Sequence, residues 1–148
     1  IAFKEALDDS FKDYQKQVLV NSKRLAEILM KNGFNCITGG TDTHLVLLDL
    51  RGSGFTGKDA EKALSDAGIT TNKNAIPFDP QPPAIASGVR IGTPGVTTRG
   101  MKEQEIDLIG ELIIEAIKNG ENQEVLISCK KRVNDLCSKF PIYKDLLI

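Results

Sequence analysis

The spacing of hydrophobic and polar positions predicts a long helix at the start of the chain and short strands after it. Apolar residues recur at helical spacings from Leu7 to Ile28, and Gly33 offers a stop for this helix. Thr56 begins a loose capping pattern for a shorter helix that ends at Gly68. Four short segments have the composition of strands, at residues 35–38, 44–50, 69–72 and 89–91.

The helical period returns after the last predicted strand and predicts two more helices. We expect Thr97 or Thr98 to cap the first, which ends at Gly120. The second carries apolar residues over 126–140 and stops before Pro141. The order is helix, two strands, helix, strand, loop, strand and two helices. This order predicts an α+β fold, in which a small, mostly antiparallel sheet is covered by helices.

Residues 74–87 interrupt these patterns with a proline-rich segment, NAIPFDPQPPAIAS, which holds four of the six prolines of the chain. Neither a helix nor a central strand tolerates prolines at this density, because each removes a backbone N–H and fixes φ. A long, stiff loop of this kind lies at the surface with its shape largely preset, and such loops are more often functional than idle.

Composition narrows the class of protein without identifying it. At 148 residues, with 41% hydrophobic and 26% charged residues, the chain has the length and composition of one globular domain. Its net charge of −1 argues against sequence-independent binding of nucleic acid, which requires a basic surface. No segment approaches the roughly 20 apolar residues of a membrane span, so no membrane partner is expected.

The cysteines and the single histidine predict neither a disulfide framework nor a metal site. Cys36, Cys129 and Cys137 form no C-x-x-C pair and are odd in number, which favours a reducing compartment. We expect Cys129 and Cys137 to pack in the core. His44 could act as a general base, but the chain has no Ser or Cys in a nucleophile setting, so a structural role is the expectation. One histidine with scattered aspartates lacks metal-ligand spacing.

Arg90 is the strongest candidate for chemistry. It stands between Val89 and Ile91 in a predicted strand, so its side chain leaves the face that its neighbours bury. Gly88 and Gly92 allow a backbone or a ligand to approach closely. The guanidinium geometry suits a carboxylate or a phosphate, held by two parallel hydrogen bonds. A structural ion pair with one of the twenty acidic residues is the alternative.

Three segments, TDTHLVLLDLR, TTNKNAIPFDPQPP and SGVRIGTPGVTTRG, resemble in this order the C-terminal part of serine hydroxymethyltransferase. The last one follows the family pattern S-G-[IV]-R-[IVL]-G-T-P-x-[IVL]-T-x-R-G, and the resemblance covers nearly the whole chain. It implies the C-terminal small domain of a fold-type I transferase that depends on pyridoxal phosphate. Residues 1–32 would then form a long connecting helix, and residues 33–148 the small α+β domain.

The resemblance also implies a function for particular residues. The family interconverts serine and glycine, transferring a one-carbon unit to tetrahydrofolate with pyridoxal 5'-phosphate as cofactor. Arg90 matches the arginine that holds the substrate carboxylate. Asn74, Pro82, Pro83 and Ala84 match positions of the folate pocket. Family members usually carry a serine and a bulkier apolar residue where this chain has Pro82 and Ala84, so backbone contacts are expected there.

The Schiff-base lysine of the family belongs to a T-T-T-H-K sequence, which this chain lacks. We therefore expect no catalytic residue in this chain and no activity of the chain alone. The chain is expected to be a fragment of a longer cytoplasmic enzyme whose large domain carries the lysine. The full-length enzyme is expected to be a homodimer or a homotetramer.

Two other functions remain open on the residues themselves. A free-standing module that binds a small anion could use Arg90 for regulation without catalysis. The small domain of another fold-type I enzyme, such as an aminotransferase, would also carry a carboxylate-binding arginine. The NKNAIPFDPQPP segment argues against the aminotransferase.

Overall fold

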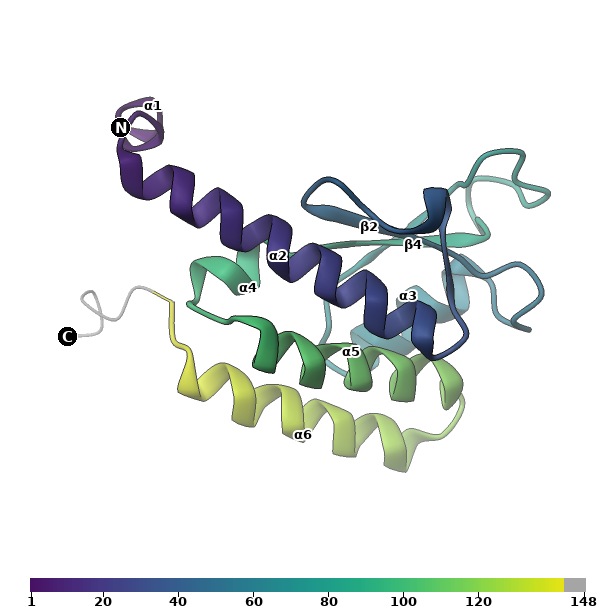
Figure 1. Cartoon of the computed structure of the whole chain (residues 1–148). Coiled ribbons are helices and arrows are strands. Elements are labelled where there is room, and N and C mark those ends of the chain that lie inside the picture. The colour runs from purple at the N-terminus through teal and green to yellow at the C-terminus, as the bar shows by residue number, and fades with distance from the viewer. Residues whose placement is uncertain (143–148) are drawn as a thin grey trace.

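A single antiparallel sheet organises the computed structural model, which describes residues 1–142 (Figure 1). The strands lie in the order β1-β2-β4-β3, with each neighbouring pair antiparallel. Their bounds are β1 Asn35–Cys36, β2 Leu45–Asp49, β3 Asn72–Asn74 and β4 Gly88–Gly92. In this register Arg90 of β4 lies opposite Leu47 of β2 on one side and Asn72 of β3 on the other.

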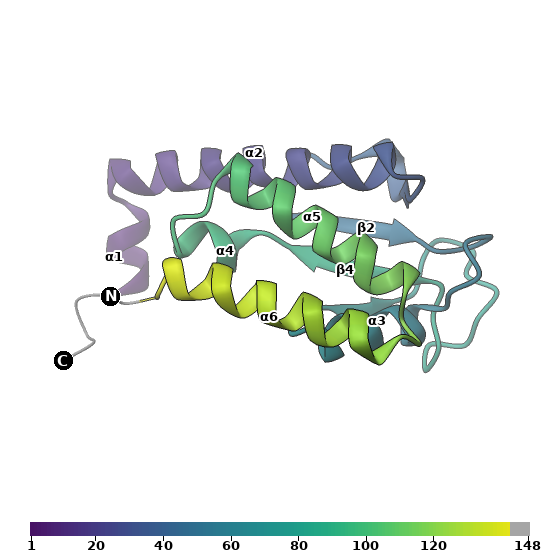
Figure 2. The same cartoon turned by 90° about the horizontal axis from the view of Figure 1, so that it is seen from below.

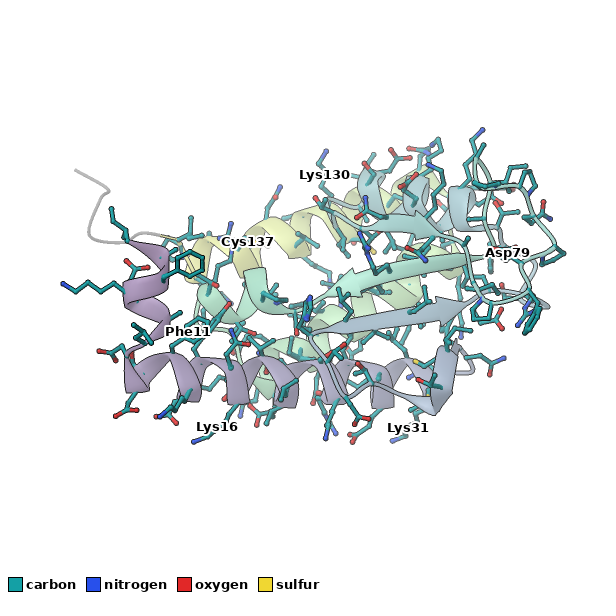
Figure 3. The ribbon with its side chains drawn as sticks, turned by 90° about the horizontal axis from the view of Figure 1, so that it is seen from above. Phe11, Lys16, Lys31, Asp79, Lys130 and Cys137 are labelled. Carbon is teal, nitrogen blue, oxygen red and sulfur yellow. The ribbon has the colours of Figure 1, made fainter. Side chains whose placement is uncertain are left out.

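The helices cover one face of the sheet and leave the other open. Figure 2 shows α5 and α6 lying across the sheet, whereas Figure 3, seen from the opposite side, shows no helix in front of β2 and β4. The α+β prediction is therefore confirmed, with the helices on one side. The helix bounds are α1 Ala2–Ala6, α2 Asp9–Lys31, α3 Gly57–Asp66, α4 Pro94–Thr98, α5 Glu103–Lys118 and α6 Gln123–Lys139.

The core lies between the covered face of the sheet and these helices. Val46 and Leu48 of β2 and Val89 of β4 are fully buried there. They belong to one cluster with apolar residues of α2, α3, α5 and α6, among them Leu29, Leu64, Ile113 and Leu126. Burying a side chain of this size contributes about 1.5–3 kcal/mol. Among residues 1–142, no helix is long and apolar enough to cross a bilayer.

The first predicted helix divides into two. The carboxylate of Asp8 accepts a hydrogen bond from the Ser10 N–H at 2.8 Å and caps α2, while α1 lies across the start of α2 (Figure 2). Leu7 and Phe11, which the helical period placed on an apolar face, are exposed. The fully buried residues of α2 begin at Val18, one turn after the half-buried Tyr14, whose hydroxyl lies 3.0 Å from the Thr98 hydroxyl.

The cap predicted for the helix that ends near Gly120, which is α5, is wrong, because tertiary contacts use the hydroxyl of Thr97. That hydroxyl accepts a hydrogen bond from the buried Asn21 side chain at 2.8 Å and donates to the Thr93 carbonyl at 2.8 Å. Residues 94–98 therefore form the separate short helix α4. α5 begins five residues later, after Lys102, whose N–H donates to the Glu105 carboxylate at 2.8 Å.

The remaining differences concern short elements. The first predicted strand keeps only two residues before a 3₁₀ turn over Ile37–Gly39, which contains Thr38 at φ 65°. The third strand lies at 72–74, because its backbone pairs with β4, while Ile69 packs against the core from outside the sheet. The Thr56 cap of α3 is confirmed by reciprocal hydrogen bonds with Asp59. Cys129 is buried as expected, but Cys137 is only half-buried.

Candidate functional site

The open face of the sheet is a surface formed by alternate residues of three strands. Antiparallel pairing and the alternation of side chains put these residues on one side. They are Leu45, Leu47, Asp49, Asn72, Asn74, Gly88, Arg90 and Gly92. Arg90 is exposed at the centre of this set, whereas its neighbours Val89 and Ile91 are buried on the other face.

Arg90 differs from the other four arginines in having no protein partner among residues 1–142. The other four each donate to an oxygen: Arg24 to Asp107, Arg51 to Asp49, Arg132 to Glu115, and Arg99 to the carbonyl of Phe140. Within the described chain, no carboxylate approaches the Arg90 guanidinium closely enough for an ion pair. The structural ion pair that the sequence left open is therefore not formed there, and the guanidinium donors face the open side of the sheet.

The two glycines beside Arg90 have different roles. A Cβ at Gly88 would lie 2.6 Å from the Leu48 carbonyl oxygen and 2.8 Å from that of Asn74, so Gly88 is needed for close strand pairing. A Cβ at Gly92 would lie 3.3 Å from Leu45 Cδ2, the end of a flexible side chain. At Gly88 the group that approaches closely is therefore the backbone of the neighbouring strands. At Gly92 a side chain would meet only the movable end of Leu45, so a larger residue is less strongly excluded there.

Asn74 lies on the open face near Arg90. It pairs with Gly88, two residues before Arg90, and diagonal neighbours of this kind are about 7–8 Å apart. The half-buried Asn74 side chain donates from Nδ2 to the Ala75 carbonyl at 2.6 Å. This hydrogen bond orients the amide, while its oxygen accepts no hydrogen bond from residues 1–142. The structure thus brings two predicted site residues to neighbouring positions.

Pro82, Pro83 and Ala84 lie in the loop that joins β3 to β4, and all three are exposed. The carbonyl of Pro82 accepts hydrogen bonds from the N–H groups of Ile85 and Ala86, both at 2.9 Å, which folds this part into a turn. The loop extends beyond the strands at the end where β3 stops and β4 starts (Figure 1). The side chains at 82–84 are thus presented to solvent, away from the core.

Asp79 is a residue of this loop that the sequence reasoning missed. Its carboxylate accepts hydrogen bonds from the N–H groups of Ile76, Gln81 and Ser87 at 3.1, 2.9 and 2.9 Å, and from the Ser87 hydroxyl at 2.6 Å. Figure 3 shows Asp79 at the end of the sheet where this loop lies. The available signal was an aspartate inside a proline-rich loop, because aspartate commonly accepts from backbone N–H groups in turns.

Sequence comparison identifies the family to which these residues belong. The family model described as serine hydroxymethyltransferase matches residues 1–113. The chain belongs to the serine hydroxymethyltransferase family. The match includes the whole sheet, the loop at 75–87 and Arg90, and it decides against an aminotransferase.

Two curated relatives carry the same family name. They are the serine hydroxymethyltransferases of Francisella tularensis subsp. tularensis (strain WY96-3418) and of Francisella tularensis subsp. mediasiatica (strain FSC147). Each is 51% identical to this chain over 144 residues, which is 97% of the chain and 34% of the relative. The chain thus spans about a third of the length of these serine hydroxymethyltransferases.

Two carboxylates of this serine hydroxymethyltransferase chain hold the loop at 75–87 and the edge strand β3 in place. Desolvation acts to raise the pKa of Asp79, but hydrogen bonds from the Ser87 hydroxyl and from three backbone N–H groups hold it well below its usual range. At the other edge, Lys73 of β3 donates its N–H and its ammonium to Glu61 of α3, at 3.0 and 2.8 Å, and lowers the pKa of Glu61. Both loop and strand are thus held by ionised carboxylates.

The other candidates add nothing to the site. His44 is exposed. Its backbone carbonyl accepts a hydrogen bond at 3.1 Å from the N–H of Thr93, the residue that follows β4. In the part of the chain that the structure describes, no three His, Cys, Asp or Glu side chains gather as metal ligands would. Lys73 is the lysine of the sheet, and its ammonium is paired with Glu61.

Proposed function

We propose that this chain is the C-terminal part of a serine hydroxymethyltransferase that interconverts serine and glycine, with transfer of the one-carbon unit to tetrahydrofolate. The observation that carries the proposal is the Arg90 guanidinium, exposed on the open face and without a carboxylate partner in residues 1–142. Membership of the serine hydroxymethyltransferase family supports the carboxylate of an amino acid as the ligand of this arginine.

Arg90 acts by orientation. Two parallel hydrogen bonds from the planar guanidinium fix both oxygens of the substrate carboxylate, and with them the directions of the bonds at Cα. Holding the reacting bond in one orientation contributes to rate by positioning alone. Pyridoxal 5'-phosphate supplies the electron-withdrawing chemistry when it is bound, and the lysine that carries it belongs to a part of the enzyme outside this chain.

The folate side of the site is formed by Asn74 and by the loop residues Pro82, Pro83 and Ala84. Asn74 offers an oriented amide beside Arg90. The exposed turn at 82–84 offers backbone groups and apolar surface to a flat heterocycle. The neighbouring positions of Asn74 on β3 and Arg90 on β4 support a single site for the two substrates.

In this proposal, residues 1–32 connect the small domain of residues 33–148 to a large domain that carries the cofactor lysine. The chain alone is inactive. The exposed apolar side chains at Ile1, Phe3 and Leu7 support a covering partner for the first helix, and we assign this role to the rest of the enzyme. The full-length enzyme is a cytoplasmic homodimer or homotetramer.

Substitution of Arg90 in the full-length enzyme tests the proposal. Arg90→Ala should weaken serine binding by about thirty-fold to several thousand-fold, because a buried carboxylate then loses its charged partner. Arg90→Lys should restore little, since a point charge cannot reproduce the two-pronged contact. The measurements are serine affinity, kcat/KM for serine cleavage and the melting temperature of each purified variant.

Arg24→Ala is the matched control, because Arg24 is also an exposed arginine but is paired with Asp107. This control should keep the serine affinity of the parent enzyme. The proposal is wrong if Arg90→Ala lowers the melting temperature and leaves serine affinity unchanged, or if the parent enzyme does not convert serine to glycine.

A further inference from the structure

The loop over residues 75–87, called the proline loop below, is closed by one side chain. Ile76 lies just after β3, and Ser87 lies just before β4. Both N–H groups donate to the same oxygen of Asp79, Oδ2, at 3.1 and 2.9 Å. The other oxygen, Oδ1, accepts from Gln81 N–H and from the Ser87 hydroxyl. A single carboxylate therefore joins the entry, the middle and the exit of the loop.

These hydrogen bonds hold backbone that its own residues disfavour. Phe78 and Ala86 both have φ of 56°, a left-handed conformation that costs energy for any residue with a Cβ. Phe78 immediately precedes Asp79, and its side chain is 97% exposed, so packing does not hold it in place. Ala86 immediately precedes Ser87. Strained conformations persist only where the surroundings over-determine them. The contacts with Asp79 do so beside Phe78, whereas Ala86 is also held by its carbonyl, which accepts from the Gly57 N–H of α3 at 2.8 Å.

The segment that these contacts control carries the proposed folate residues. Pro82, Pro83 and Ala84 stand between Gln81, whose N–H donates to Asp79 Oδ1, and Ser87, whose N–H donates to Oδ2. Asn74 is linked through the Ala75 carbonyl to the segment that Ile76 anchors. Because residues 82–84 are exposed, their position is set by these anchors and by the Pro82 turn. At the exit of the loop, the N–H groups of Gly57 and Lys58 add hydrogen bonds to the Ala86 and Ile85 carbonyls at 2.8 and 3.0 Å.

We propose that Asp79 is a positioning residue for the folate co-substrate, whose carboxylate holds the proline loop in the conformation that places Asn74 and residues 82–84 around a reduced folate. The inference rests on the proposed function and adds to it a residue that acts through the loop, without touching either substrate. An ionised carboxylate suits this role because it only accepts hydrogen bonds, and all four groups around it are donors.

Two graded substitutions in the full-length enzyme test the role. Ser87→Ala removes one hydrogen bond to Asp79, and Asp79→Asn places an amide nitrogen against an N–H donor while keeping the size of the side chain. Tetrahydrofolate affinity should fall about fivefold for Ser87→Ala and about tenfold to a hundredfold for Asp79→Asn. Serine affinity should stay within about twofold of the parent in both, which a general loss of structure would not allow.

Amide hydrogen exchange of the same proteins measures how firmly the hydrogen bonds of the proline loop are held. The amides of Ile76, Gln81 and Ser87 should exchange faster in both variants, in the same order as the loss of folate affinity. Asp135→Asn is the matched control, because Asp135 is an exposed acid on α6, on the covered side of the sheet. This control should change neither folate affinity nor exchange in the proline loop.

Each outcome assigns a cause. If Asp79→Asn is too unstable to purify, Ser87→Ala alone decides, since it retains the carboxylate and three of its hydrogen bonds. Faster exchange with unchanged folate affinity, or unchanged exchange in both variants, overturns the role of Asp79 and leaves the proposed function standing. Failure of the parent enzyme to bind tetrahydrofolate overturns the proposed function and, with it, this inference.

Discussion

The two faces of the sheet are made of the same strands but have opposite chemistry. On the covered face, Val46, Leu48 and Val89 are fully buried beneath the helices. On the open face, the alternate positions carry an aspartate, two asparagines, an arginine and two glycines beside two half-exposed leucines. Strand alternation thus separates the buried apolar side chains of one face from the polar side chains of the other.

This separation explains how a cation that has no partner among residues 1–142 is tolerated at the centre of a strand. Arg90 is one residue from Val89 in the chain, yet their side chains occupy different environments. An arginine directed into the covered face would require a buried partner, because an uncompensated buried charge costs several kcal/mol. On the open face the guanidinium stays exposed to solvent, so it does not incur this cost. We therefore expect substitutions on the covered face to lower the stability of the fold more than substitutions on the open face.

The largest effect on folding is expected on the covered face. Leu48→Ala should destabilise the chain by about 2–5 kcal/mol, since it removes a fully buried side chain and leaves a cavity. Leu47→Ala, one residue away on the open face, should cost less than about 1 kcal/mol, because Leu47 is only partly buried. Urea unfolding of the 148-residue chain measures both. Equal losses would show that the open face also carries core energy.

The glycines of the open face sharpen the comparison. Gly88→Ala should destabilise the fold by about 1–3 kcal/mol, because its Cβ would meet backbone oxygens of β2 and β3 that cannot move independently. Gly92→Ala should cost less, since only the end of the Leu45 side chain must shift. The melting temperatures of the two variants give the order. A larger loss for Gly92→Ala would contradict the strand packing described above.

A smaller effect is expected at Asn74, which bears on ligand binding. In the full-length enzyme, Asn74→Ala should weaken tetrahydrofolate binding by about 1 kcal/mol, the net contribution of one hydrogen bond. Serine affinity should hardly change, because Arg90 is untouched. Titration calorimetry with each substrate separates the two. Equal losses for serine and tetrahydrofolate would mean that the substitution had disturbed the open face as a whole.

The smallest expected effect is a pH dependence of the proline loop. Because hydrogen bonding lowers the pKa of Asp79, the ionised form contributes order at every pH above the unfolded value of about 4, and this order is lost as pH falls toward the folded value. Asp49 and Arg51 are the charged neighbours whose fields reach Asp79. Loop amide exchange, corrected for its intrinsic pH dependence, should therefore quicken below about pH 4. Asp79→Asn should abolish the additional change, and its persistence there would assign the effect to Asp49.

Local patterns were sufficient for most of the elements and for the orientation of Arg90. The helical period and the capping pattern at Thr56 describe interactions within a few residues, so they are visible in the sequence. Alternation alone directed Arg90 away from the buried face, and the structure agrees. The loop at 74–87 was recognisable because proline excludes regular structure whatever surrounds it.

Contacts between distant residues decided the rest. Thr97 could not be excluded as a helix cap from the sequence, because Asn21, its partner, is far away in the chain and comes near only when α2 packs against α4. The absence of an acidic partner for Arg90 in residues 1–142 is a property of the folded surface, since the sequence contains twenty acids that could have paired with it. The role of Asp79 depends on Ser87 being folded back onto it. The sequence by itself determined which elements form and which face Arg90 takes, because those depend on near neighbours, and the tertiary structure alone decided which polar groups meet.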